Sequence, residues 1–286
     1  MTNFRYAPLP SRALLTLNGE ETRPFLQGLI SNDMDKVAPN RAIWAALLTP
    51  QGKYLHDFFV AEIEGLIYLD CEAERRADLK KRLMMYRLRT KIDIEDSDDF
   101  EIGVVYGDGA PGAMGLSDEA GRAVSVNQGI AFVDPRLGGA GVRVIGASPP
   151  DIAPGTAEDY DALRLSLGLP DGSRDLTVEK STLLESGFEE LNGVDFDKGC
   201  YMGQELTART KYRGLVKKRL MPVTIVGPLP ESGTEILQDG KNAGEMRSSG
   251  DGQGIALIRL ECFDSTAELT AGDATITPKK PDWAAF

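Results

Sequence analysis

The sequence contains few residues that bind metals. Its 286 residues include one histidine, His56, and three cysteines, Cys71, Cys200 and Cys262, with no CxxC spacing. A structural zinc site or an iron–sulfur cluster commonly takes four such ligands. We therefore expect no metal to be bound stably by this chain alone. The scarcity of cysteine also argues against a disulfide framework and favours a reducing compartment.

Long apolar runs and excess positive charge are also missing. No stretch approaches the roughly 20 apolar residues needed to span a bilayer, and residues 1–21 lack the features of a signal or transit peptide. The 44 acidic residues outnumber the 32 basic ones and give a net charge of −12. Because a nucleic-acid-binding surface is strongly basic, we expect no direct binding of nucleic acid. From the missing apolar run and targeting features we expect a cytoplasmic protein that does not bind a membrane.

The first three quarters of the chain mix strands and helices. Apolar runs and turn signals predict strands at 13–17, 43–48, 54–63, 66–71, 102–106, 131–133 and 142–145. Helical spacing predicts helices at 20–28, 72–89 and 159–167, and in the second of these Leu79, Leu83 and Tyr86 share the apolar face. The acid-rich stretch 93–101 is expected to be a linker, and the Gly-rich stretch 107–115 is expected to be a loop.

The pattern changes after Arg219 to short strands. They are predicted at 221–226, 235–237, 242–247, 255–260 and 267–277, with Asp239-Gly240 as a hairpin turn. Their even spacing and the weak helical periodicity predict a small antiparallel barrel. The whole chain therefore belongs to the α+β class.

The segment Asp197–Glu205 concentrates reactive groups. A helix is expected to begin near Gly203 and to end at Gly214. Cys200 then lies just ahead of the helix N-terminus, where the helix dipole favours a thiolate, and Lys198 lowers the thiol pKa further. The nearby aspartates, Asp195 and Asp197, oppose this effect. The alternative is that Cys200 is a small buried apolar residue.

Two polar groups in the first quarter of the chain also have alternative interpretations. Ser31-Asn32-Asp33 is typical of a capped turn. Asp57 lies in the strand 54–63 on the face of Phe59, opposite to His56. Its carboxylate is either solvated at a sheet edge, which the residues alone favour, or a buried acceptor for a polar ligand. We assign His56 no catalytic role.

Lys198–Glu205, followed by Arg209 and Tyr212-Arg213-Gly214, closely resembles the K-G-C-Y-x-G-Q-E signature of YgfZ-type folate-binding proteins. These are relatives of the glycine-cleavage aminomethyltransferase (T-protein) and of the mitochondrial factor that matures iron–sulfur enzymes. Three further segments resemble family motifs: Phe25–Asp33, Gly52-Lys53 with Asp57, and Gly244–Ser248 with Ile255–Leu257.

The resemblance implies two interleaved mixed α/β lobes and a C-terminal antiparallel barrel around a central channel for tetrahydrofolate. It divides the chain into 1–214, with the second lobe at about 95–150, and a barrel at 215–286. It makes Asp57 an inward-facing acceptor for the pterin, and it pairs Arg209 and Arg213 with the folate's glutamate carboxylate. Asn32, Gln204 and Glu205 complete the expected cofactor-binding set.

The function that the resemblance implies is a tetrahydrofolate-binding accessory protein for iron–sulfur cluster assembly or repair in client enzymes. Such a protein would affect tRNA modification indirectly, through tRNA-thiolating clients. Cys200, supported by Lys198, would be a reactive thiolate or a transient iron ligand shared with a partner protein, because one thiol cannot hold a cluster.

Two departures from the T-protein pattern argue against aminomethyl transfer: Cys200 itself, and Asp134–Gly138 in place of a T-G-E-type segment. Within that segment, Arg136 either binds an anion or serves the loop alone. Two other functions stay open. One is a folate-dependent aminomethyltransferase or demethylase, and the other is a scaffold with a vestigial folate pocket.

Overall fold

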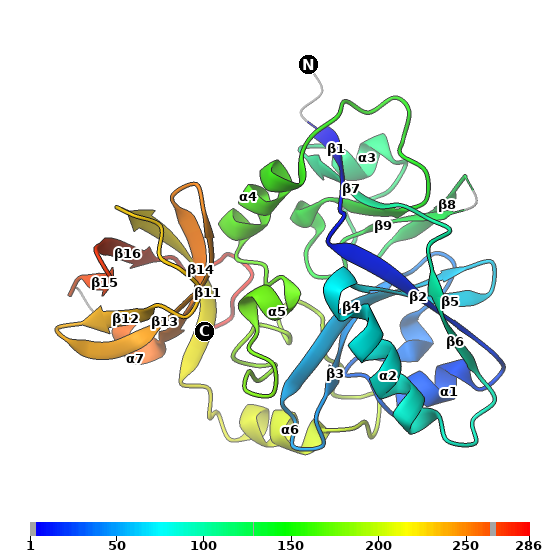
Figure 1. Cartoon of the computed structure of the whole chain (residues 1–286), viewed down its shortest axis with the longest axis horizontal. Helices are drawn as coiled ribbons and strands as arrows, with labels where there is room; N and C mark the ends of the chain where they lie inside the picture. The colour runs from blue at the N-terminus through cyan, green and yellow to red at the C-terminus, as the bar shows by residue number, and fades with distance from the viewer. Residues whose placement is uncertain (1–3, 128, 264–266) are drawn as a thin grey trace. The chain divides into compact units, whose positions relative to one another are not determined.

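The computed structural model describes residues 4–127, 129–263 and 267–286 (Figure 1). The chain forms two compact units, and each is assembled from segments that are far apart in sequence. Unit 1 comprises Met1–Leu48, His56–Tyr160 and Leu191–Met202, and unit 2 comprises Thr49–Leu55, Asp161–Glu190 and Gly203–Phe286. The predicted boundary between residues 214 and 215 and the lobe at 95–150 stay predictions.

Unit 1 contains two five-stranded sheets. The first has the order β1-β7-β10-β9-β8 and is antiparallel throughout. Its strands are β1 (Phe4–Pro8), β7 (Ile102–Gly107), β8 (Ala123–Val126), β9 (Gly129–Val133) and β10 (Val142–Ile145). The second has the order β3-β4-β5-β2-β6. Its strands are β2 (Arg12–Asn18), β3 (Ile43–Leu48), β4 (Tyr54–Ile63), β5 (Leu66–Glu72) and β6 (Asp93–Ser97).

Short helices accompany these sheets. They are α1 (Thr22–Gln27), α2 (Arg76–Arg87) and α3 (Ala110–Ala113), whereas α4 (Ala157–Leu167) begins in unit 1 and continues into unit 2 after Tyr160. In α2, Leu79 and Leu83 are fully buried, whereas Tyr86 is 37% exposed, so the prediction of a three-residue buried face is wrong at its last member. No helix within the described residues is long and apolar enough to cross a membrane.

Three local predictions are corrected by the structure. The acid-rich stretch 93–101 is not all linker, because β6 pairs with β2 and buries Ile94 and Ser97 between exposed acidic residues. The predicted loop 107–115 contains the short helix α3. The predicted strand 267–277 is a hairpin of β15 (Leu269–Ala271) and β16 (Ala274–Pro278), which turns at Gly272 with a positive φ of 58°.

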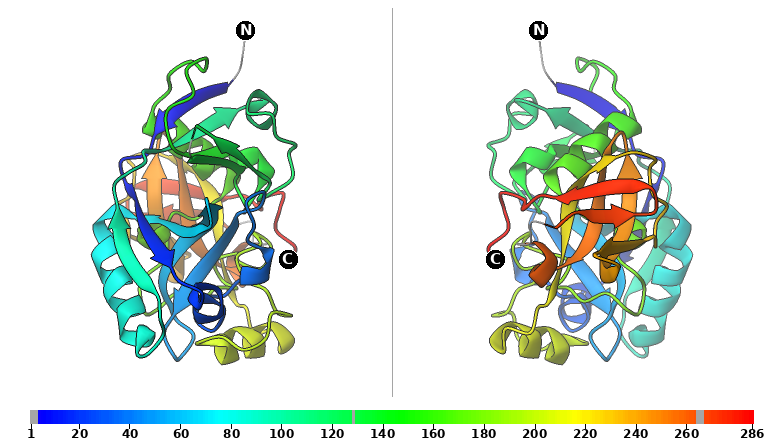
Figure 2. Two further views of the ribbon diagram at one scale, coloured as in Figure 1. Left: turned by 90° about the vertical axis from the view of Figure 1, so that its right-hand side faces the viewer. Right: turned by 90° about the vertical axis from the view of Figure 1, so that its left-hand side faces the viewer.

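Unit 2 contains the predicted barrel, which is closed in the order β11-β14-β13-β12-β15-β16 (Figure 2). The remaining strands are β11 (Lys218–Val226), β12 (Glu235–Gln238), β13 (Lys241–Gly250) and β14 (Gln253–Arg259). Asp239 and Gly240 both have positive φ, which confirms the hairpin turn. Buried apolar side chains fill the interior, among them Met221, Ile236, Met246, Ile258 and Ile276. Unit 2 also has the helices α5 (Gly172–Asp175), α6 (Gln204–Tyr212) and α7 (Leu260–Phe263).

The two sheets of unit 1 are joined by buried ion pairs. Asp70 on β5 accepts hydrogen bonds from Arg12 on β2 at 2.7 Å and from Arg143 on β10 at 2.8 Å. Arg143 also lies 3.6 Å from Asp134, which is bound by Arg136 through two hydrogen bonds at 2.7 and 3.0 Å. Every side chain in this group is at most 4% exposed. We call these five residues the arginine–aspartate network.

Aromatic and electrostatic contacts complete the network. Arg143 lies 3.8 Å from the ring centroid of Phe59, and Arg136 lies 5.1 Å from it. Burial raises the pKa of Asp134, but the charges of Arg136 and Arg143 outweigh it and hold the pKa below its usual range. The network therefore consists of charged groups whose desolvation is compensated by one another.

Replacement of Asp70 by asparagine is expected to destabilise unit 1 strongly. The substitution leaves Arg12 and Arg143 buried without their shared anion, which typically costs about 3–5 kcal/mol. The exposed Asp118→Asn provides a control and is expected to stay within about 0.5 kcal/mol of the wild type. Urea denaturation followed by circular dichroism measures both. Equal unfolding midpoints for the two variants would contradict the role given to the network.

Candidate functional site

Two segments that are far apart in sequence meet in unit 1. The first, residues 27–33, begins at the last residue of α1, and the second is Leu191–Met202. The backbone N–H of Asp195 donates to Ser31 O at 3.0 Å, and that of Met202 donates to Gly28 O at 3.0 Å. The Ser31 hydroxyl donates to Gly193 O at 2.6 Å. The loop that carries Cys200 is therefore fixed on both sides of the cysteine; we call residues 195–202 the cysteine loop.

Two predicted site residues hold this arrangement together. The Asn32 amide donates to Trp44 O and Asn192 O, each at 2.8 Å. The Lys198 ammonium donates to Gln27 O at 2.8 Å and to Ile30 O at 2.6 Å. Burial lowers the pKa of Lys198 to about 8, against the charges of Asp33 and Asp195, which raise it. In this structure both side chains bind backbone carbonyls, and their predicted roles toward a cofactor and a thiol stay predictions.

Cys200 is solvent-exposed, so the alternative that it is a buried apolar residue is wrong. The other two thiols have different environments. Cys71 is buried on β5, and desolvation raises its pKa to about 12. Cys262 is half-buried, and burial together with the charge of Glu261 raises its pKa. Cys200 therefore combines exposure with an anchored backbone, which a thiol needs to meet a partner in a fixed orientation.

Asp57 lies on β4 and is 3% exposed, so the interpretation of a solvated edge carboxylate is wrong. Trp44 Nε1 donates to Asp57 Oδ2 at 2.9 Å. His56 faces the other side of the strand and bonds to Asp78 of α2 at 2.9 Å. Burial and the charge of Arg75 lower the pKa of His56 to about 4, so the imidazole is neutral at pH 7. Asp57 is thus a buried acceptor beside the Trp44 indole.

The remaining predicted residues lie in unit 2. Gly203 and Gly214 have φ of 79° and 58°, as the predicted helix boundaries require. Arg209 lies 3.9 Å from Glu205 one turn earlier, and both are exposed, as is Arg213. Gln204 is half-buried at the first turn of α6. The roles of these residues at a folate site stay predictions.

The hairpin turn before β4 packs against α6 within unit 2. A Cβ atom at Gly52 would lie 2.6 Å from Leu206 Cβ and 2.7 Å from Gly203 O, and Gly52 has φ of 80°. Both the close approach and the left-handed conformation require glycine at this position. This gives a structural reason for the Gly52-Lys53 motif.

Sequence reasoning missed the arginine–aspartate network and the hydrogen bond from Trp44. The signal was a charged residue inside an apolar run, as at Asp70 in the strand 66–71 and Arg143 in the strand 142–145. For Arg136 the interpretation of a loop-serving residue fits, because its guanidinium binds Asp134 two residues earlier. Among the residues described, no group of three or more His, Cys, Asp or Glu side chains could hold a metal ion.

The fold is that of the aminomethyltransferases. The structure matches glycine cleavage system aminomethyltransferase T from Bartonella henselae with a TM-score of 0.79 over 99% of this chain and 86% of that one, at 12% identity. Residues 217–286 match the family described as CAF17, C-terminal beta-barrel domain. These findings confirm the predicted α+β fold with a C-terminal antiparallel barrel.

The chain belongs to the IBA57 family of iron–sulfur cluster assembly factors. It is 33% identical to the human "Iron-sulfur cluster assembly factor IBA57, mitochondrial" and 32% identical to the mouse protein of that name. Both alignments cover 96% of this chain and 84% of the relative. These relatives are named mitochondrial, and this finding overturns the cytoplasmic location expected from the sequence. Membership of the narrower YgfZ-type group stays a prediction.

The three thiols are expected to react with iodoacetamide in a fixed order at pH 8. Cys200 reacts first because it is exposed, Cys262 reacts more slowly, and Cys71 stays unmodified. At a pKa of about 12 only about one Cys71 thiol in ten thousand is ionised at that pH, and its burial hinders access. Mass spectrometry of tryptic peptides measures the order, and all three should react in urea. Modification of Cys71 before Cys200 in the folded protein would contradict it.

Proposed function

We propose that this protein binds tetrahydrofolate and supports the assembly or repair of iron–sulfur clusters, with Cys200 as the group that meets the cluster. Through client enzymes that modify tRNA, it affects tRNA modification indirectly. The observation that carries the proposal is an exposed thiol on a loop whose backbone is tied to residues 28–31 on both sides of the cysteine. Membership of the IBA57 family supports the cluster-assembly part.

The ligand count makes the proposed role a shared one. An iron–sulfur cluster usually takes four protein ligands, and no group of three candidate ligands exists among the described residues. Cys200 therefore supplies one thiolate, and a partner protein supplies the others. The cluster is cargo that passes through the complex rather than a resident group. Carrier and client proteins with exposed cysteines are the partners that this chemistry requires.

The chemistry of Asp57 fits a pterin. A carboxylate can accept hydrogen bonds from the N–H groups of a pteridine ring, and Asp57 is buried beside Trp44, which already donates to its Oδ2. The exposed cations Arg209 and Arg213 suit the glutamate carboxylates of a folate. When bound, the reduced pterin can carry a one-carbon unit. Asp57 would orient it by accepting hydrogen bonds, and within the same unit Asn32 is a further polar group of the proposed site.

The second candidate is a folate-dependent aminomethyltransferase or demethylase, which the match to aminomethyltransferase T favours. Against it stands the segment Asp134–Gly138, where the sequence departs from the T-protein pattern. Asp134 and Arg136 there are fully engaged in the buried network. A scaffold without folate binding is the third possibility, and the experiments below separate all three.

Cys200→Ser is expected to abolish the function in cluster assembly. A hydroxyl is a poor iron ligand, whereas the substitution changes one exposed atom and leaves the loop anchored. The measurement is the activity of an iron–sulfur enzyme in cells that lack the gene and express each variant. Cys262→Ser is the matched control and should restore wild-type activity. Full rescue by Cys200→Ser would contradict the proposal, and if activity were lost in Asp57→Asn instead, the transferase would be favoured.

Asp57→Asn is expected to weaken tetrahydrofolate binding about tenfold or more. The asparagine still accepts from Trp44 but loses the charge-assisted hydrogen bond, worth about 1.5–3 kcal/mol. Anaerobic calorimetry with tetrahydrofolate measures the effect. Asp78→Asn, whose carboxylate contacts His56 on the other face of β4, serves as the control and should bind normally. Equal affinities for the two variants would rule out Asp57 as the pterin acceptor. If the wild type does not bind tetrahydrofolate at all, the scaffold without folate binding is the function that fits.

A further inference from the structure

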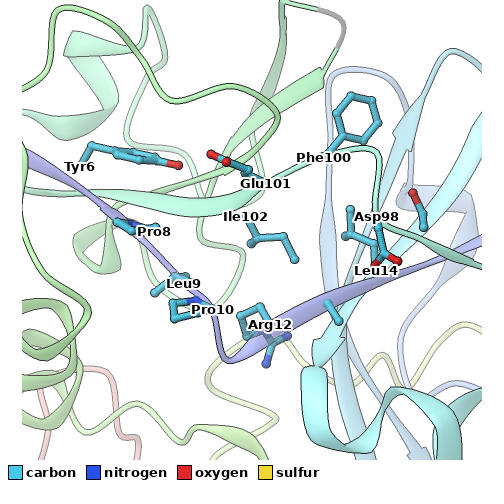
Figure 3. Close-up of a pocket in the computed structure, with 12 residues that line it drawn as sticks. Tyr6, Pro8, Leu9, Pro10, Arg12, Leu14, Asp98, Phe100, Glu101 and Ile102 are labelled. Carbon is cyan, nitrogen blue, oxygen red and sulfur yellow. The ribbon is translucent and has the colours of Figure 1, made fainter.

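A cavity lies in unit 1, where the chain passes twice between the two sheets (Figure 3). One passage joins β1 to β2, and the other joins β6 to β7. The cavity has a volume of about 490 Å³, within the range of small-molecule sites. Its walls are largely apolar and include Pro8, Leu9, Pro10, Leu14, Phe100 and Ile102. Neither Cys200 nor Asp57 lines it.

A buried hydroxyl without a partner borders this cavity. Tyr6 on β1 is 6% exposed, and among the described residues its hydroxyl has no hydrogen-bond partner. Buried polar groups are normally satisfied because an unmade hydrogen bond is costly. Tyr6 lies opposite Val105, so Gly103, two residues along β7, shares its face of the sheet. A Cβ atom at Gly103 would lie 2.3 Å from the hydroxyl oxygen, so the ring can lie across β7 only because this position is glycine.

The hydroxyl of Tyr6 points toward a carboxylate whose charge is not compensated (Figure 3). Glu101 is exposed, and within the part of the chain that the structure describes it makes no side-chain hydrogen bond or ion pair. The other charged residues of the cavity are paired: Arg12 with Asp70 at 2.7 Å, and Asp98 with Arg76 at 2.7 Å. Burial, reinforced by the charge of Glu101, raises the pKa of Tyr6, so its hydroxyl stays protonated at neutral pH.

We propose that this cavity binds an aliphatic ammonium group. The ammonium donates hydrogen bonds to the Glu101 carboxylate and to the Tyr6 hydroxyl oxygen, and the methylene chain packs on Pro8, Leu9 and Ile102. The exposed Glu101 side chain turns to admit the ligand to the covered hydroxyl. An anion is disfavoured by Glu101 and by the net charge of −12. The ammonium belongs either to a free alkylamine or to a lysine side chain of a peptide.

The test is a titration of the intact chain at pH 7 and low salt with n-butylammonium and with Nα-acetyllysine methylamide, followed by NMR. Both are expected to bind saturably, whereas 1-pentanol, which keeps a chain of similar length without the charge, is not. Glu101→Gln should weaken binding about tenfold or more, since the charge-assisted bond is lost. Asp108→Asn, which removes an exposed charge just beyond the other end of β7, is the control and should bind as the wild type does.

Tyr6→Phe separates a binding role from a structural one. It removes a buried hydroxyl that has no partner among the described residues, so the melting temperature should stay the same or rise, while the affinity for the ammonium should fall about fivefold. Tighter binding of the lysine amide than of butylammonium would support a peptide source, and the reverse would support a free amine. Absence of saturation by both at about 100 mM, or an unchanged affinity in Glu101→Gln, would overturn the proposal.

Discussion

The architecture of unit 1 depends on the buried pairing of three arginines with two aspartates. Arg12 and Asp70 come from one sheet, and Arg143 comes from the other, so the shared carboxylate of Asp70 joins the sheets directly. Buried ion pairs often add little net stability compared with apolar packing, but each partner is expensive to leave alone. The network therefore acts mainly by selecting one relative position of the two sheets, because any shift between them would leave a buried charge without its partner.

The same network connects the core to the candidate folate residue. Arg136 lies 5.6 Å from the Trp44 ring centroid, and Trp44 donates a hydrogen bond to Asp57. Trp44 on β3 therefore links the arginine–aspartate network to the Asp57 carboxylate, and its packing against Arg136 helps to fix the position of that carboxylate. Asp134 and Arg136 belong to the segment where the sequence departs from the aminomethyltransferase pattern. In this chain Asp134 pairs with Arg136 and lies 3.6 Å from Arg143, so both residues of the segment belong to the contacts that join the sheets.

Local features were predictable from sequence, whereas long-range partners were not. The glycine turns at Gly203 and Gly214 and the Asp239-Gly240 hairpin depend on backbone preferences that a few residues encode, and the structure has them. The strand Asp93–Ser97 was missed because its acidic residues point outward and its pairing with β2 crosses some 80 positions of sequence. The residues alone favoured a solvated Asp57, and only the family resemblance placed it inward, since nothing near it in sequence reveals that Trp44 would bond to it. The type of a residue limits the interactions that its side chain can make, and the partner that folding brings to it determines which interaction forms.

In the cysteine loop, the contacts that hold the backbone are separate from the thiol that is exposed. Ser31, Asn32 and Lys198 all direct their polar groups at backbone carbonyls, of residues 193, 44 and 192, and 27 and 30 respectively. A side chain that binds a carbonyl fixes the path of the chain whatever the neighbouring side chains are, so these residues constrain the loop rather than its reactivity. Cys200 can then be exposed without the loop being mobile. If a partner supplies the remaining ligands, a rigidly held thiol reduces the entropy lost when the shared site forms. That is the physical advantage of using five hydrogen bonds from three side chains to position one exposed sulfur.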